Sequence, residues 1–191
     1  DEYTAGKLAL IREHSERISR IVRQMSELAR PQAGQRARCD VNQVVRRALE
    51  MVRFDERARS SEIRFEFDPG LPEVDAVEDE ISQVCINLAL NAFDAMAGNP
   101  GDRARRLTVR SWSSAQAVHF AFRDSGPGVP ARVREKLFQP FMTTKEAGRG
   151  SGLGLSVSYR ILEQHGGVLR LDPDDSSGAV FVFELPRQER V

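Results

Sequence analysis

The chain has 191 residues, which is enough for one domain with an appendage or for two small domains. Apolar residues make up 40% and charged residues 29%, a soluble composition that excludes the fibrous and disordered classes. Basic and acidic residues number 28 each, so no net charge draws the chain onto nucleic acid or an anionic membrane. Two cysteines exclude a disulfide scaffold, and with no membrane-length apolar run they indicate a cytoplasmic segment. Cys85 is expected to be a small core residue and Cys39 an exposed connector thiol.

The first predicted element is an amphipathic helix over residues 7–30. Its apolar side chains recur at alternating steps of three and four, and the stripe is wider than a two-stranded seam, which favours a helical bundle. Pro31 ends the pattern, and one helix of this length cannot bury its own stripe. We therefore expect 1–34 to be part of a bundle and 35–191 to be a second domain; the alternative is a helix packed on its own domain.

From residue 40 onward, helix and strand patterns are mixed. Asp40 or Asn42 is expected to cap a helix that runs through Val52. Strands are predicted at 63–67, 74–77, 106–112, 117–123, 168–172 and 179–185, and further helices at 79–97, near 131–138 and at 152–165. Without strict βαβ alternation, this order predicts an α+β sandwich with one mixed, mostly antiparallel sheet and about three helices on one face.

The helix predicted to begin with Asp79 as its cap carries a polar stripe beside a broad apolar surface. The stripe consists of residues at steps of three and four, namely Glu80, Gln83, Asn87, Asn91 and Asp94. Amide oxygens suit Mg²⁺, which favours oxygen ligands, and two asparagines are poor helix formers that need a reason to be there. The alternative is a helix whose outer face is simply wet.

A glycine-containing segment directly follows a predicted strand. Asp124 stands at the strand end and is followed by Gly126 and Gly128, which allow close backbone approach. A carboxylate in this position can accept a hydrogen bond from an exocyclic amine such as that of adenine. The same residues are also common in plain turns, which is the alternative interpretation.

A second glycine-rich segment, 148–155, leads into a helix. Its alternate glycines expose the backbone, and the N–H groups at the start of the helix suit phosphate. Lys145 and Arg149 add positive charge upstream. The segment has neither the Walker A nor the Rossmann spacing, and a flexible linker is the alternative.

Taken in order, these motifs resemble those of the GHKL ATP-binding domains. The segments that carry the resemblance are 87–92 (N box), 124–128 (G1 box), 138–141 with 143–145 (F box) and 150–155 (G2 box). The version with an F box is typical of sensor histidine kinases of two-component systems, and residues 7–31 resemble the second helix of their dimerisation domain. The resemblance implies a Bergerat-type two-layer sandwich preceded by one long bundle helix, in the cytoplasmic part of a sensor.

The resemblance also implies cofactors, ATP and Mg²⁺, and roles for residues. Asn91 would be the principal magnesium ligand, Asn87 would assist at metal or phosphate, and Lys145 would reach phosphate. Asp124 would accept from the adenine amino group. The residues expected to line the nucleotide are Asn87, Asn91, Asp94, Asp124, Gly126, Gly128, Phe138, Thr143, Thr144, Lys145, Gly150, Ser151, Gly152, Leu153, Gly154 and Leu155. The last G box departs from the pattern, because Ala179 replaces a hydroxyl residue.

The expected chemistry is phosphoryl transfer rather than hydrolysis. Hydrolysing relatives carry a glutamate where this chain has Asn87, and an amide cannot activate water. The acceptor would be a histidine of the dimerisation domain, but His14 lacks the family's acidic neighbour, and His119 and His165 fit structural roles. We therefore expect the acceptor helix to lie outside this chain, which would not phosphorylate itself.

The partners implied are a response-regulator receiver domain and, through the bundle, a second copy of the full-length protein. Neither nucleic acid nor contact of this segment with a membrane is expected. Two alternatives stay open: a GHKL-type ATPase, and a nucleotide-binding regulatory module without kinase activity.

Overall fold

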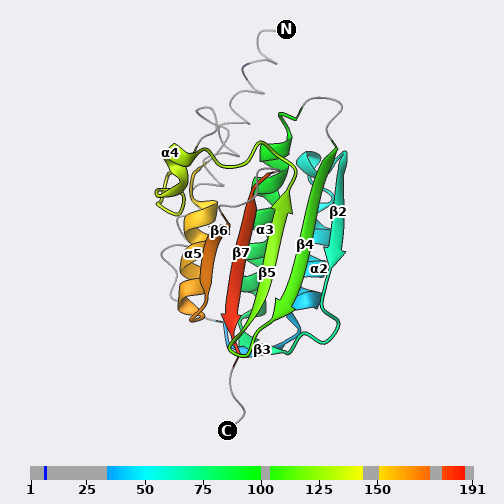
Figure 1. Cartoon of the computed structure of the whole chain (residues 1–191), viewed down its shortest axis with the longest axis vertical. Helices are drawn as coiled ribbons and strands as arrows, with labels where there is room; N and C mark the ends of the chain where they lie inside the picture. Colours follow the sequence, from blue (N-terminus) through cyan, green and yellow to red (C-terminus); the bar gives the residue numbers. More distant parts are fainter. Residues whose placement is uncertain (1–6, 8–33, 100–103, 144–150, 173–177, 188–191) are drawn as a thin grey trace.

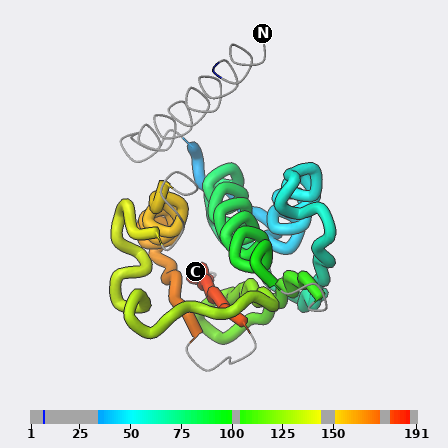
Figure 2. The backbone as a smooth tube through the Cα atoms, turned by 90° about the horizontal axis from the view of Figure 1, so that it is seen from above, coloured from blue at the N-terminus to red at the C-terminus, as the bar shows by residue number. Residues whose placement is uncertain are grey.

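A computed structural model describes residue 7 and residues 34–99, 104–143, 151–172 and 178–187 (Figure 1). The predicted bundle helix lies outside these ranges, apart from Lys7. The described part forms two layers, with a sheet on one side and α2, α3 and α5 side by side on the other (Figure 2). This confirms the predicted two-layer α+β sandwich.

The larger sheet has five strands in the order β2-β4-β5-β7-β6. Their bounds are Ser61–Glu66 (β2), Arg105–Ser113 (β4), Ala117–Asp124 (β5), Val168–Asp172 (β6) and Val180–Pro186 (β7). Only β2 and β4 pair in parallel, so the sheet is mixed and mostly antiparallel, as predicted. The antiparallel register of β5 and β7 brings the end of β5, with Asp124, next to the start of β7.

The helices over this sheet are α2 (Val41–Val52), α3 (Glu78–Met96) and α5 (Gly154–Gln164), with a short α4 (Ala131–Arg134) and a 3₁₀ turn, η1 (Glu56–Ala58). Asp40 caps α2, since its carboxylate accepts from the N–H of Gln43 at 3.2 Å. The prediction that Asp79 caps α3 is wrong. Val77 occupies the cap position without a side-chain bond, and Asp79 lies in an acidic first turn that the helix dipole stabilises. The predicted helices near 131–138 and at 152–165 are both shorter than expected.

The core lies between the helices and the inner face of the sheet. Alternate strand residues point inward, and the rings of Phe120 and Phe183 on neighbouring strands stack with centroids 5.1 Å apart. Helix α3 runs through the middle of the helical layer and buries Leu88 and Phe93. Cys85 is fully buried, as expected of a small core residue, and burial raises the pKa of its thiol.

The chain enters this domain through a small second sheet that the sequence patterns did not indicate. Strand β1 (Ala37–Cys39) pairs antiparallel with β3 (Val74–Ala76). Cys39, expected as an exposed connector thiol, is therefore buried opposite Val74. Burial raises the pKa of its thiol, and nearby acidic groups raise it further. Arg36 donates to the carbonyl of Gln164 at the end of α5, which anchors the entering segment to the helical layer.

Within the described segments, no helix combines the length and apolar character needed to cross a bilayer.

Candidate functional site

The polar stripe of α3 is partly covered by other parts of the protein. All five of its residues are half-buried, so the interpretation of a simply wet face is wrong. The Asn87 amide nitrogen donates to the Gly154 carbonyl at 3.2 Å and to the Ser158 hydroxyl at 3.3 Å. Its amide oxygen accepts from the Gln83 amide nitrogen at 3.1 Å. The middle of the stripe thus joins α3 to the first turn of α5.

The two ends of the stripe hold carboxylates next to cationic or ionisable groups. Glu80 lies 3.8 Å from the ring of His165, and partial burial raises the pKa of its carboxyl against the lowering effects of His165 and Arg36. At the other end, Asp94 lies 3.4 Å from Arg57. The pKa of the Arg57 guanidinium is raised, chiefly by its hydrogen bond to Asp55, so Arg57 stays charged beside Asp94.

Asn91 lies on the same stripe, one turn after Asn87. It is half-buried, and within the described ranges its amide makes no hydrogen bond to another group. An amide oxygen held in this way is of the hard-donor type that suits Mg²⁺. The described residues contain no cluster of three or more His, Cys, Asp or Glu of metal-binding geometry, so this donor set would leave several positions to water and phosphate.

Asp124, at the end of β5, is held by the backbone. It is only 4% exposed, and its Oδ1 accepts from the N–H of Gly126 at 2.7 Å and from the N–H of Ala179 at 3.2 Å. Two donors on one oxygen fix the plane of the carboxylate. The N–H of Ala179 was not anticipated, because the sequence showed only the loss of a hydroxyl at this position.

Glycines are needed around this carboxylate because the backbone segments lie in direct contact. A side chain at Gly178 would overlap the Asp124 carbonyl oxygen. A β-carbon at Gly126 would lie 2.8 Å from the Asp124 carboxylate and 3.3 Å from Ala95 of α3. Gly128 has φ +78°, which glycine adopts without strain, and packs against the Gly178 carbonyl. Gly178 belongs to the last G box but was not among the residues expected to line the nucleotide, and its contact with Asp124 adds it to the candidate site.

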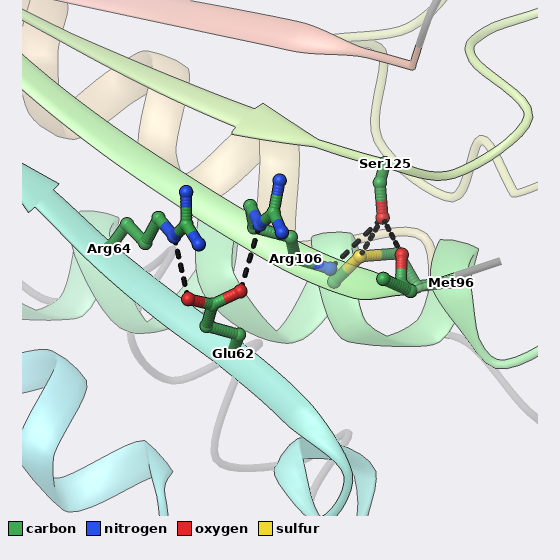
Figure 3. Close-up of polar contacts among 6 residues, drawn as sticks. Glu62, Arg64, Met96, Arg106 and Ser125 are labelled. Carbon is green, nitrogen blue, oxygen red and sulfur yellow. Dashed lines mark hydrogen bonds and ion pairs between the residues drawn. The ribbon is translucent and has the colours of Figure 1, made fainter.

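Ser125 ties the loop after β5 to the start of β4 (Figure 3). Its hydroxyl accepts from the N–H of Arg106 at 2.9 Å and donates to the Ala104 carbonyl at 2.7 Å. The same oxygen lies 3.3 Å from the sulfur of Met96, at the end of α3. These contacts hold the segment in place between α3 and the start of β4.

The segments on either side of residues 144–150 meet each other. Phe141 has φ +65°, a strained value for a side-chain-bearing residue, and a β-carbon at Gly152 would lie 2.7 Å from its carbonyl oxygen. Phe138 contacts the ring of Tyr159 on α5, with centroids 5.5 Å apart. Thr143 is exposed. The predicted site residues Thr144, Lys145 and Gly150 lie outside the described residues.

Helix α5 begins at Gly154, two residues after Gly152. Leu153 is fully buried, its N–H donates to the Ser151 hydroxyl at 3.3 Å, and no described side chain caps the helix. Gly154 opens the helix and Leu155 is half-buried. The first N–H groups of α5 therefore have no side-chain acceptor among the described residues, which is the arrangement that suits a phosphate oxygen.

The two described histidines have structural contacts, as predicted. His165 is 3% exposed; it accepts from the N–H of Val77 and contacts the carbonyl of Ile161. The ring of His119 stacks on Trp112 at a 9° interplanar angle, and its Nδ1 lies 3.4 Å from Glu184. Both rings are held by contacts within the domain, which does not favour either as a phosphate acceptor.

Helix α3 contacts both glycine-rich segments, at Ala95–Gly126 and at Asn87–Gly154. Residues 76–189, which contain all of these contacts, match the family described as histidine kinase-, DNA gyrase B-, and HSP90-like ATPase. The chain belongs to this family.

Several members of the family are similar over most of the chain. The sensor histidine kinase ZraS of Escherichia coli (strain K12) is 34% identical over 172 residues, which is 90% of this chain and 36% of ZraS. The catalytic domain of the histidine kinase ThkA superposes with a TM-score of 0.68 at 29% identity, covering 81% of this chain and 99% of that domain. The structure of ThkA in complex with the response regulator protein TrrA gives a TM-score of 0.75 at 28% identity, covering 94% of this chain and 50% of ThkA. The chain thus spans about a third of the length of ZraS.

Proposed function

We propose that this chain is the nucleotide-binding part of a sensor histidine kinase and binds ATP with Mg²⁺. One observation carries the proposal: α3 contacts both glycine-rich segments, at Gly126 and at Gly154. Groups suited to a base, a cation and a phosphate chain are therefore arranged along one helix. The family match over residues 76–189 supports the same assignment.

The base would lie against Asp124. Two backbone N–H groups hold one oxygen of this buried carboxylate, and a carboxylate oriented in this way suits the amino group of adenine. Gly126 and Gly128 would shape the pocket, since both pack closely against neighbouring backbone or side chains. The phosphates would then extend toward the N-terminus of α5, and Lys145 would add charge there.

The metal would be held by Asn91, whose half-buried amide fits a hard cation. Asn87 would assist, although its amide already bonds α5 and Gln83. When bound, Mg²⁺ neutralises charge on the phosphate oxygens. The protein's own contribution is to orient the triphosphate between α3 and the first turn of α5.

The acceptor would be the imidazole of a histidine on a dimerisation bundle, to which residues 1–34 would contribute the second helix. Asn87 stands where hydrolysing relatives carry a glutamate, and an amide that donates to Gly154 cannot accept a proton from water. This disfavours the alternative of a GHKL-type ATPase. His119 and His165 have structural contacts, and His14 is followed by Ser15 rather than by an acidic residue, so the chain alone is not expected to phosphorylate itself.

The phosphoryl group would pass from that histidine to an aspartate of a response-regulator receiver domain. The complex of ThkA with the response regulator protein TrrA supports a partner of this class. The full-length protein would form a homodimer through its bundle and act in the cytoplasm.

Isothermal titration of the chain with Mg²⁺–ATP tests the proposal directly. We expect saturable heat with one site per chain, and no heat would overturn it. Incubation with [γ-³²P]ATP tests the second part: label on His14 that is lost in His14→Gln would overturn the expectation that the acceptor lies elsewhere. Rapid steady-state hydrolysis would instead favour the ATPase alternative.

A further inference from the structure

A chain of four polar groups connects α3 to α5 in the middle of the site. The Gln83 amide nitrogen donates to the Asn87 amide oxygen at 3.1 Å. The Asn87 amide nitrogen donates to the Gly154 carbonyl at 3.2 Å and to the Ser158 hydroxyl at 3.3 Å. The Ser158 hydroxyl in turn donates to the same Gly154 carbonyl at 2.9 Å.

We infer that Gln83 is a positioning residue, which sets the orientation of the Asn87 amide and thereby fixes the first turn of α5 against α3. The inference that this also tunes nucleotide affinity rests on the proposed function. Gln83 itself contacts neither glycine-rich segment through any hydrogen bond in the described ranges, so it would act through Asn87 alone.

The Asn87 amide can link Gln83 to Gly154 in only one of its two orientations. In the present orientation the Asn87 amide is matched on both sides: its nitrogen faces the Gly154 carbonyl and the Ser158 hydroxyl, and its oxygen faces the Gln83 nitrogen. If the amide turned over, its oxygen would face the Gly154 carbonyl, and two acceptors would meet without a proton between them. The donor from Gln83 disfavours that turn, because it would then face the nitrogen of Asn87.

Burial makes this polarity important. Ser158 is fully buried and Asn87 is half-buried, so water has little access to the bonds between them. Hydrogen bonds in such a place hold their geometry better than exposed ones, and an unmatched pair costs more. The first turn of α5 is also where the phosphates are proposed to bind. Its position relative to Asn91 would therefore set the distance between the phosphate site and the metal site.

Two substitutions at position 83 separate hydrogen-bond polarity from shape. Gln83→Glu keeps the size of the side chain, but as a carboxylate it accepts only, whereas Gln83→Met removes the donor without adding charge. Gln116→Glu, on an exposed hairpin turn, is the control for added negative charge. Ser158→Ala removes the hydroxyl at the other end of the chain of bonds.

The first measurement is amide hydrogen exchange at Val157 and Ser158, in the first turns of α5, without nucleotide. We expect exchange to be roughly five-fold faster in Gln83→Met, Gln83→Glu and Ser158→Ala, because each loses one hydrogen bond of ordinary strength. The control should exchange at the wild-type rate. As the pH falls, the Glu variant should return toward wild type, because a protonated carboxyl can donate to Asn87, whereas the Met variant should not.

The second measurement is the affinity for Mg²⁺–ATP, which we expect to fall in parallel with the loss of protection. Unchanged exchange in both Gln83 variants, or identical pH profiles for the Glu and Met variants, would overturn the inference. If the wild type binds no nucleotide, the proposed function fails, and the exchange data alone decide the role of Gln83.

Discussion

The Nε2 atom of His165 accepts a hydrogen bond of 3.0 Å from the backbone N–H of Val77, 88 residues earlier in the chain. The other ring nitrogen, Nδ1, lies 2.8 Å from the carbonyl of Ile161 and so carries the proton. One buried ring thus joins the end of α5 to the start of α3, the two helices that carry the candidate site.

Replacing this ring is expected to destabilise the fold. His165→Ala leaves the buried N–H of Val77 without an acceptor and opens a cavity, which together should lower the free energy of unfolding by about 2–4 kcal/mol. His119→Ala, on the outer face of the sheet, should cost clearly less. Urea unfolding measures both, and equal losses would contradict the role assigned to His165.

The contact between Gly178 and Asp124 predicts that position 178 tolerates no side chain. Gly178→Ala would push a methyl group into the Asp124 carbonyl and should cost about 2–3 kcal/mol of stability, as overpacking does. Gly98→Ala is the matched control, because nothing lies within 4 Å of its β-carbon position and its effect should stay within about 0.5 kcal/mol. Thermal unfolding distinguishes the two, and similar melting temperatures would contradict the close approach.

The proposed role of Asp124 predicts a variant that loses affinity more than stability. The oxygen of Asn in Asp124→Asn can still accept from Gly126 and Ala179, so stability should stay within about 1.5 kcal/mol of wild type. Loss of the charged acceptor should weaken Mg²⁺–ATP binding about 10- to 100-fold. Titration calorimetry with ATP and GTP checks this, since the wild type should prefer ATP. Unchanged ATP affinity would show that the base lies elsewhere.

Glu62 on β2 predicts a measurable pKa shift (Figure 3). Its carboxylate lies 2.6 Å from Arg64 and 2.9 Å from Arg106, and these hydrogen bonds hold the pKa of Glu62 below its ordinary value, Arg64 more than Arg106. Because the folded-state pKa is lowered, the ionised group stabilises the fold above the unfolded-state pKa, and this contribution is lost as the pH falls through the folded-state pKa.

NMR titration of the Glu62 carboxyl measures this shift. Arg64→Gln should raise the pKa of Glu62 toward its ordinary value more than Arg106→Gln does. All three side chains are about half exposed, so added salt should reduce the shift in the wild type. The reverse order of the two variants would contradict the geometry.

Much of the fold and part of the site could be predicted from the sequence because their signals are local. The period of apolar residues indicated the three main helices and the larger strands, and the steps of three and four placed Asn87 and Asn91 on one face of α3. The strand ending at Asp124 and the glycines after it indicated a segment whose backbone a ligand could approach closely, or else a plain turn. None of these needs knowledge of a distant segment.

The rest was decided by contacts between segments far apart in the chain. Strand β1 is too short to show a period, and its pairing with β3 buries Cys39 against expectation. The amide of Asn87 could have faced solvent, and only the position of α5, 67 residues away, gives it Gly154 as a partner. The need for glycine at 178 arises where β7 begins beside the end of β5, because two backbones meet there with no space for a side chain. A local pattern specifies which residues share a face, but the partner of each polar group is set by which elements pack together.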